Sequence, residues 1–170
     1  MNIAIAVVGV IDQMLDVLQK LSPSQYTQKQ ETFHGTSLGE HFRHIYEFQE
    51  CLLSHIEGET LCYDDRKRCL DLQTSVVMIS DKFRVMKELL VRVARQNYEL
   101  EVKHFLGSAG ECYVKSSFHR ELLFVFDHTI HHIAIIRIGI ESEIGHQLLP
   151  KDFGFTPSTT RYHNFINSKN

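Results

Sequence analysis

Histidine is the residue type whose number and placement in this sequence are most informative about chemistry. The chain contains 11 histidines in 170 residues, and His128, His131 and His132 lie close together. The helical period of 3.6 residues places His128 and His132 one turn apart on the same face of a helix. This spacing suits two imidazoles that converge on one metal ion, whereas His131 is expected to face solvent.

A second pair of histidines, His41 and His44, occurs earlier in the chain. Both lie on one flank of a predicted helix, so either of them could face the pair on the later helix. Three neutral imidazoles with a fourth position left open are typical of a catalytic zinc site, because substrate or hydroxide can occupy that position. Nickel and ferrous iron also accept imidazole, so the expected cofactor is a divalent metal ion: zinc, nickel or iron. The alternative for this spacing is a set of histidines that shield a helix–helix seam.

Apolar residues at steps of three and four predict two helices in the first third of the chain. The first covers the apolar N-terminal segment and ends at Ser22-Pro23-Ser24. The second begins at Ser37, where a capping box with Glu40 would satisfy free N–H groups, and runs to Gly58. Their predicted buried positions are Val7, Val8, Ile11, Leu15, Leu18 and Leu21 in the first helix, and Leu38, Phe42, Ile45, Gln49, Leu52 and Ile56 in the second.

Two further helices are predicted in the second half. The third runs from about Thr74 to Arg95, and the fourth begins at Ser116 or Ser117 as N-cap. Alternation with period two on both sides of the turn at residues 107–110 predicts a hairpin between these helices. The predicted buried positions are Val77, Met78, Phe83, Met86, Leu89, Leu90 and Val93 in the third helix, and Leu122, Phe126, Ile130, Ile133, Ile136 and Ile140 in the fourth.

These elements predict one domain over residues 1–170 with an all-α fold, an antiparallel four-helix bundle with a short hairpin between helices three and four. The turn-rich segment Leu149–Pro157 is expected to lie over the bundle or over a partner subunit. The length and the 43% of hydrophobic residues suffice for one core of ordinary size.

Composition excludes several classes of function. The 18 basic and 21 acidic residues give a formal charge of -3 with no basic tract, so nucleic acid is not an expected partner. The apolar N-terminus lacks a positively charged leader, and no uninterrupted apolar run approaches the ~18 residues that span a bilayer, so no membrane segment is expected. The four cysteines form no Cys-x-x-Cys pair, which favours reduced thiols in the cytoplasm.

The two histidine segments, SLGEHFRHI at residues 37–45 and RELLFVFDHTIHHI at residues 120–133, resemble the DinB-like (YfiT-like) superfamily of metal-binding four-helix bundles. The resemblance extends over nearly the whole chain. It implies that the first ligand is His44, seven residues after the serine that opens the second helix, and that His128 and His132 complete the set. His41 matches no ligand of the pattern and is kept as an alternative or supporting group. Many members have a tryptophan before the second helix, where this chain offers Phe33.

Other side chains near the predicted site have two interpretations each. Cys51 and His55 follow His44 on the same flank and could approach the site, but a small buried cysteine is the commoner case. Glu47 and Asp127 could orient an imidazole or act as a base, although both are expected to be solvated. Arg137 could bind an anionic substrate or pair with a carboxylate, and the polar segment 156–162 could border a pocket.

Two functions follow as hypotheses. The first is a metal-dependent enzyme, a thiol transferase or a hydrolase, as in members of the resembled superfamily, acting on a small molecule with a low-molecular-weight thiol or water as nucleophile. The second is a stress-associated bundle that binds metal or a ligand without turnover and acts as a homodimer. A fourth protein ligand, such as His41, would favour the second hypothesis. Whether the protein is an enzyme is left open by the sequence.

Overall fold

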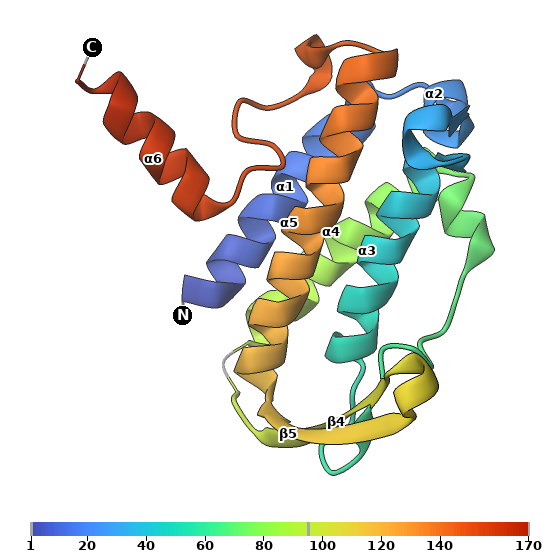
Figure 1. Cartoon of the computed structure of the whole chain (residues 1–170), viewed down its shortest axis with the longest axis vertical. Helices are drawn as coiled ribbons and strands as arrows, with labels where there is room; N and C mark the ends of the chain where they lie inside the picture. Colours follow the sequence, from blue (N-terminus) through green and yellow to red (C-terminus); the bar gives the residue numbers. More distant parts are fainter. Residues whose placement is uncertain (1, 95, 170) are drawn as a thin grey trace.

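Four long helices make up the body of the molecule and surround one apolar core (Figure 1). The computed structural model describes residues 2–94 and 96–169. The long helices are α1 (Asn2–Lys20), α3 (Leu38–Leu53), α4 (Val76–Val93) and α5 (Phe118–Glu143). Both α1 and α3 pack against α4 and against α5, so the apolar stripe of each helix is buried by the others.

The all-α expectation is met only in part, because the mostly helical chain also contains two small sheets. The first sheet pairs β1 with β2 in antiparallel fashion, and in the second β4 lies between a parallel β3 and an antiparallel β5. The strands are β1 (Lys29–Gln30), β2 (Thr36–Ser37), β3 (Thr60–Leu61), β4 (Glu99–Phe105) and β5 (Glu111–Ser117). The short helical elements are α2 (Pro23–Thr27), η1 (Glu31–Phe33), η2 (Leu70–Gln73), η3 (Gly107–Ala109), η4 (His146–Leu148) and α6 (Pro157–Asn167).

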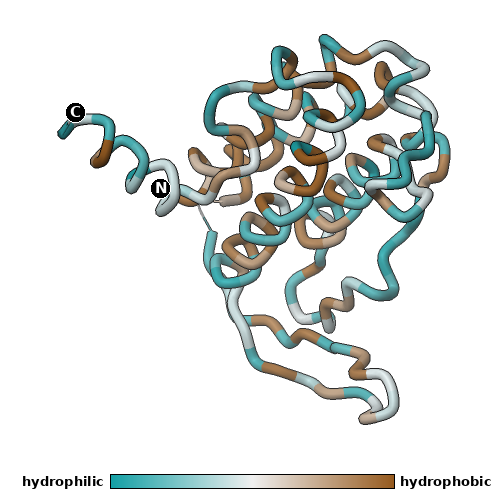
Figure 2. The backbone as a smooth tube through the Cα atoms, turned by 45° about the horizontal axis from the view of Figure 1, so that its top comes forward, coloured by the Kyte–Doolittle hydropathy of each residue, from teal (hydrophilic) through white to brown (hydrophobic). Residues whose placement is uncertain are grey.

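The hairpin predicted between the third and fourth long helices is present as β4 and β5. Its register pairs Glu99 with Ser117 at the base and Phe105 with Glu111 near the turn. Leu100 and Val102 are buried, while Glu99 and Glu101 are exposed, which is the alternation expected of a strand with one covered face. The hairpin extends beyond the ends of the helices (Figures 1 and 2).

Side-chain caps fix where the two histidine-bearing helices begin. Ser37 Oγ accepts a hydrogen bond from Glu40 N at 3.3 Å, and Glu40 Oε2 accepts one from Ser37 N at 2.8 Å, which confirms the predicted capping box. At α5, Ser117 Oγ accepts from Arg120 N at 3.4 Å. With both starts fixed, the helical period determines which histidines share a face.

Some predicted helix positions are wrong. The second long helix ends at Leu53 rather than Gly58, and Ile56 is 62% exposed because it lies beyond the last turn. In α4 the buried face is narrower than predicted: Val77 is 69% exposed and Leu89 is 38% exposed. The residues that α4 buries are Ile79, Ser80, Phe83, Met86 and Leu90, spaced as one helical face. The predicted end of this helix at Arg95 lies outside the described residues.

The C-terminal segment has two parts. Residues 149–156 pack over the body as expected: the Phe153 side chain is fully buried, and its carbonyl accepts a hydrogen bond from Arg137 Nη1 at 2.9 Å. The following helix α6, N-capped by Thr156, was not predicted and extends away from the body (Figures 1 and 2). None of the α6 residues that the structure describes is buried.

By length and mean hydropathy alone, α5 could cross a membrane, and it is the one such helix among the described residues. Its apolar residues form the centre of the core, including Leu122, Ile133 and Ile140. It also carries the histidine pair. These features fit the central helix of a packed body.

Candidate metal centre

Three histidines from two helices meet at one point between α3 and α5. One ring nitrogen from each of His44, His128 and His132 lies within 4.8 Å of the others, and all three side chains are half-buried. His44 Nε2 and His128 Nε2 are 2.9 Å apart and share a hydrogen bond. Within the part of the chain that the structure describes, this is the one group of three or more histidine, cysteine or acidic side chains arranged to hold a metal ion.

A buried polar contact fixes the two helices beside this cluster. Gln49 Nε2 donates to Thr129 Oγ1 at 3.0 Å, and Thr129 Oγ1 donates to Val125 O at 2.8 Å. Both side chains are almost completely buried, so the contact fixes how α3 lies against α5. As predicted, His131 is exposed, although its ring centroid lies 5.3 Å from that of His132.

His41 lies behind His132 and outside the cluster. Its Nδ1 is 3.3 Å from Nδ1 of His132, and its Nε2 is 3.3 Å from Thr36 Oγ1. A neutral His41 can accept the Nδ1 proton of His132, which leaves Nε2 of His132 free as a ligand atom. His41 therefore lies outside the group of three histidines and contacts it through His132.

Phe33 forms the wall behind His41. The two rings meet edge to face with centroids 4.8 Å apart. Phe33 can lie this close to α5 because residue 139 is glycine: a Cβ there would lie 1.9 Å from the Phe33 ring. A larger residue at position 139 would displace Phe33 and, with it, the support of His41.

The surroundings of His44 are different, because Arg66 donates a hydrogen bond from Nη2 to His44 Nδ1 at 3.2 Å. Glu47, one turn after His44, is 1% exposed and lies between two guanidinium groups, with Arg43 Nε at 3.4 Å and Arg66 Nε at 3.7 Å. Its Oε1 also accepts from Cys69 N at 2.9 Å. The prediction that Glu47 is solvated is wrong, because the segment before η2 covers it.

An aromatic stack covers the site on the side of His128. Sequence reasoning did not predict it. Phe48 stacks on His128 with centroids 4.1 Å apart, and Tyr63 stacks on Phe48 at 5.2 Å. Tyr63 Oη donates to Glu121 Oε2 at 3.0 Å, which fixes the stack against α5. The available signal was the position of Phe48, one turn beyond His44 on the same face.

Burial keeps the clustered imidazoles neutral. It is the main cause that lowers the pKa of His44 to about 3, of His128 to about 4 and of His132 to about 2. The Arg66 charge adds to this effect at His44, and the neighbouring imidazoles add to it at His132. Burial also lowers the pKa of His41. Neutral imidazole is the form that binds a metal, so the cluster needs no deprotonation at neutral pH.

The donor set fits a divalent metal. Two imidazole nitrogens bound to one tetrahedral zinc ion at the usual bond length lie roughly 3.3 Å apart. The His44 and His128 nitrogens at 2.9 Å would therefore have to separate by a few tenths of an ångström. Three half-buried imidazoles without a carboxylate or thiol among them suit zinc, nickel or iron better than a hard cation.

The other candidate residues lie away from the cluster. Cys51 Sγ donates to Cys62 O at 3.5 Å, and burial raises its pKa to about 11, so it is a poor nucleophile. His55 contacts Glu59 O and Tyr98 Oη.

Arg137 pairs with Glu141 at 2.9 Å and holds the C-terminal segment. Asp127 is exposed, as expected.

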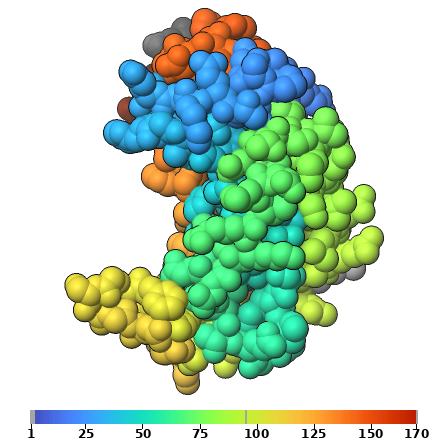
Figure 3. All heavy atoms as spheres, turned by 90° about the vertical axis from the view of Figure 1, so that its right-hand side faces the viewer, coloured from blue at the N-terminus to red at the C-terminus, as the bar shows by residue number. Residues whose placement is uncertain are grey.

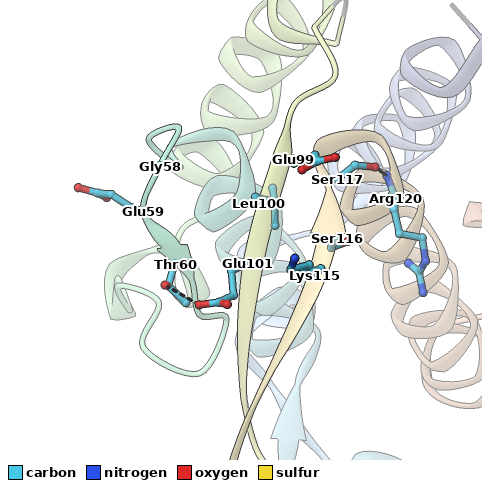
Figure 4. Close-up of a pocket in the computed structure, with 10 residues that line it drawn as sticks. All are labelled: Gly58, Glu59, Thr60, Glu99, Leu100, Glu101, Lys115, Ser116, Ser117 and Arg120. Carbon is cyan, nitrogen blue, oxygen red and sulfur yellow. Dashed lines mark hydrogen bonds between the residues drawn. The ribbon is translucent and has the colours of Figure 1, made fainter.

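Two cavities near the helix ends do not contain the histidines. One of about 690 Å³ lies between β3, the hairpin and the start of α5, and its lining includes Glu101, Lys115 and Arg120 (Figure 4). A second of about 500 Å³ lies beside Glu47 and is lined by Cys51, Cys62 and Cys69, among others. In the view of Figure 3 the surface is recessed between the segment around residues 25–40 and the projecting hairpin, and part of α5 is visible there.

A model of the DinB family matches residues 6–161 of this chain. The match covers most of the chain, including both histidine-bearing helices, and the chain therefore belongs to the DinB family. Comparison with curated proteins and with solved structures gave no match. The family assignment thus confirms the resemblance that the two histidine segments indicated.

Proposed function

We propose that this protein binds one divalent metal ion through His44, His128 and His132 and uses the remaining coordination position for reaction with a small molecule. The observation that carries the proposal is the convergence of three neutral imidazoles at a half-buried point between α3 and α5. His41 supports an open fourth position, because its Nδ1 is directed at His132 Nδ1 and not at the cluster.

A metal ion bound here would lower the pKa of a water or a low-molecular-weight thiol at its open position and so supply a nucleophile at neutral pH. The protein's own residues would do the rest. His41 fixes the ring of His132, the Phe48–Tyr63 stack fixes the ring of His128, and these apolar walls limit the access of water. A thiol transferase or a hydrolase acting on a small electrophile is the reaction class that this arrangement favours.

The metal proposal is tested by metal analysis of protein prepared without a histidine tag. We expect about one equivalent of zinc, nickel or iron per chain in the parent and almost none in a His128→Ala, His132→Ala double variant. His131→Ala is the matched control, because His131 lies beside the pair but is exposed, and it should retain the metal of the parent. Equal metal content in parent and double variant would exclude the site.

The catalytic part of the proposal needs turnover. Metal-loaded parent is assayed with a small thiol and a thiol-reactive electrophile, and separately with an activated ester in water. A metal-dependent rate that the double variant lacks would establish the enzyme. A bound metal without turnover of either kind would favour the alternative, a stress-associated bundle that binds metal without catalysis and acts as a dimer.

We also propose that the chain pairs with a second copy through α6. An isolated 11-residue helix is marginal in water, and Tyr162, Phe165 and Ile166 on α6 are exposed. Beside its base lies an open groove of about 510 Å³ whose apolar lining includes Ile5 and Ile130. Light scattering should give a dimer for the parent and a monomer for a Phe165→Asp, Ile166→Asp variant; a monomeric parent would exclude the pairing.

A further inference from the structure

Two of the three clustered histidines have opposite hydrogen-bond surroundings at Nδ1. Behind His132 lies His41, a neutral imidazole that can accept a proton. Behind His44 lies Arg66, whose guanidinium carries N–H donors and no acceptor. A histidine that binds metal through Nε2 carries its proton on Nδ1 and normally donates it to an acceptor. His132 has a neighbour that can accept this proton, and His44 does not.

The hydrogen bond from Arg66 fixes the tautomer of His44. Since Arg66 can only donate, His44 Nδ1 must be the acceptor, and the single proton of the neutral ring lies on Nε2. That proton accounts for the short contact with His128 Nε2 at 2.9 Å, with His44 as the donor. For Nε2 of His44 to bind a metal, this proton must leave and another must bind Nδ1, which places two N–H donors against each other. The ring is neutral before and after this exchange, and only the position of its proton changes.

The buried carboxylate of Glu47 offers the Arg66 guanidinium group a second hydrogen-bond acceptor, besides His44. Arg66 Nε is 3.7 Å from Glu47 Oε2, beyond hydrogen-bonding distance, and both atoms are buried without a hydrogen-bond partner. Arg66 also donates from Nη1 to Tyr63 O at 3.0 Å, and its guanidinium lies 4.6 Å above the Phe48 ring. A small shift away from His44 would let Arg66 donate to Glu47 and would satisfy both buried atoms.

We propose that Arg66 is a positioning residue that competes with the metal for His44, donating to His44 Nδ1 in the metal-free protein and to Glu47 when the metal is bound. This inference rests on the proposed metal site. It implies that Arg66 lowers the affinity of the site, so that the metal is held less tightly than three imidazoles alone would hold it. His128 and His132 are then the permanent ligands, and His44 is the ligand that metal binding recruits.

The test measures metal affinity by competition titration with zinc in the parent and in Arg66→Met. We expect the dissociation constant of Arg66→Met to be about tenfold lower than that of the parent. Arg43→Met is the matched control, because Arg43 also lies beside Glu47 and near His44 but makes no hydrogen bond to the ring. Its dissociation constant should stay within about threefold of the parent value. Weaker binding in Arg66→Met, or an equal gain in both variants, would overturn the proposal.

Nitrogen-15 NMR of the metal-free protein gives an independent readout. The proposal expects the proton of His44 on Nε2 in the parent, and a mixture or the Nδ1 form in Arg66→Met. If Arg66→Met does not fold, Arg66→Lys, which keeps the charge beside Glu47, takes its place and should bind zinc more tightly than the parent. The Nδ1 form of His44 in the metal-free parent would overturn the proposal. A parent that binds no metal but has the Nε2 form would instead identify a failure of the proposed function.

Discussion

The two flanks of the histidine cluster are built from different chemistry. The His132 flank, formed by His41, Thr36 and Phe33, consists of neutral groups and an aromatic wall. The His44 flank contains Arg66 and Glu47, which are charged and buried. A neutral acceptor supports a metal ligand at little cost, whereas buried charges hold a side chain in place only while every partner is present. The same ring type can therefore serve as a fixed ligand on one flank and as an adjustable ligand on the other.

The largest expected effect comes from removing the buried carboxylate of the charged flank. Glu47→Gln leaves Arg43 and Arg66 without their counter-charge, and we expect the free energy of unfolding to fall by about 3 kcal/mol. Urea denaturation of metal-free protein measures this change. Asp127→Asn, which removes an exposed carboxylate beside His128, should change the stability by less than about 0.5 kcal/mol. A similar small loss in both variants would show that the buried ion pairs of Glu47 contribute little to the stability of the fold.

Acid should weaken the metal-free protein through its neutral histidines. The unfolded chain binds protons near pH 6.5, whereas burial lowers the pKa of His44 to about 3 and of His128 to about 4 in the folded state. Their contribution to stability is complete above pH 6.5 and is lost as the pH falls toward the folded-state values. We expect a loss of about 2 kcal/mol between pH 7 and pH 5.5, after allowance for solvent screening.

The pH dependence is measured by urea denaturation in the presence of a chelator. His128→Gln removes one of the titrating groups and should reduce the loss. An equal loss in the parent and in His128→Gln would mean that these histidines titrate normally in the folded protein.

A smaller effect is expected on the neutral flank. His41→Phe keeps the contact with Phe33 but removes the acceptor for His132 Nδ1, so zinc affinity should fall about tenfold. The same titration in Arg66→Met is expected to move affinity in the opposite direction. If both variants bound zinc more weakly, both flanks would support metal binding, and the difference between a fixed and an adjustable ligand would be excluded.

Sequence patterns predicted the site's positions better than its surroundings. Helical period and N-caps put His128 and His132 on one face and left His41 and His44 as alternatives, and both caps are present at Ser37 and Ser117. The choice of His44 came from the family resemblance, and the structure brings this histidine together with the pair. Arg66 was not found, because it lies in a connecting segment whose path depends on tertiary contacts rather than on periodicity. For the same reason Glu47 was predicted to be exposed: the residues that cover it are more than a dozen positions away.

The fold shows the same division between local and non-local information. The long helices and the hairpin were predicted from local periodicity, and their ends were less well determined, as at Leu53 and Gly58. The parallel pairing of β3 with β4 joins Thr60 to Glu101 and could not be read from a two-residue strand. Helix α6 was missed because its apolar residues are few and none is buried in the body.

X-ray absorption spectroscopy of the zinc-loaded protein tests the central claim most directly. Three imidazole ligands should be found together with one exchangeable light atom, and addition of a small thiol should replace that atom with sulfur. Four imidazoles, with His41 as the extra ligand, would contradict the open site and favour a protein that only binds metal. Fewer than three imidazoles would contradict the site itself.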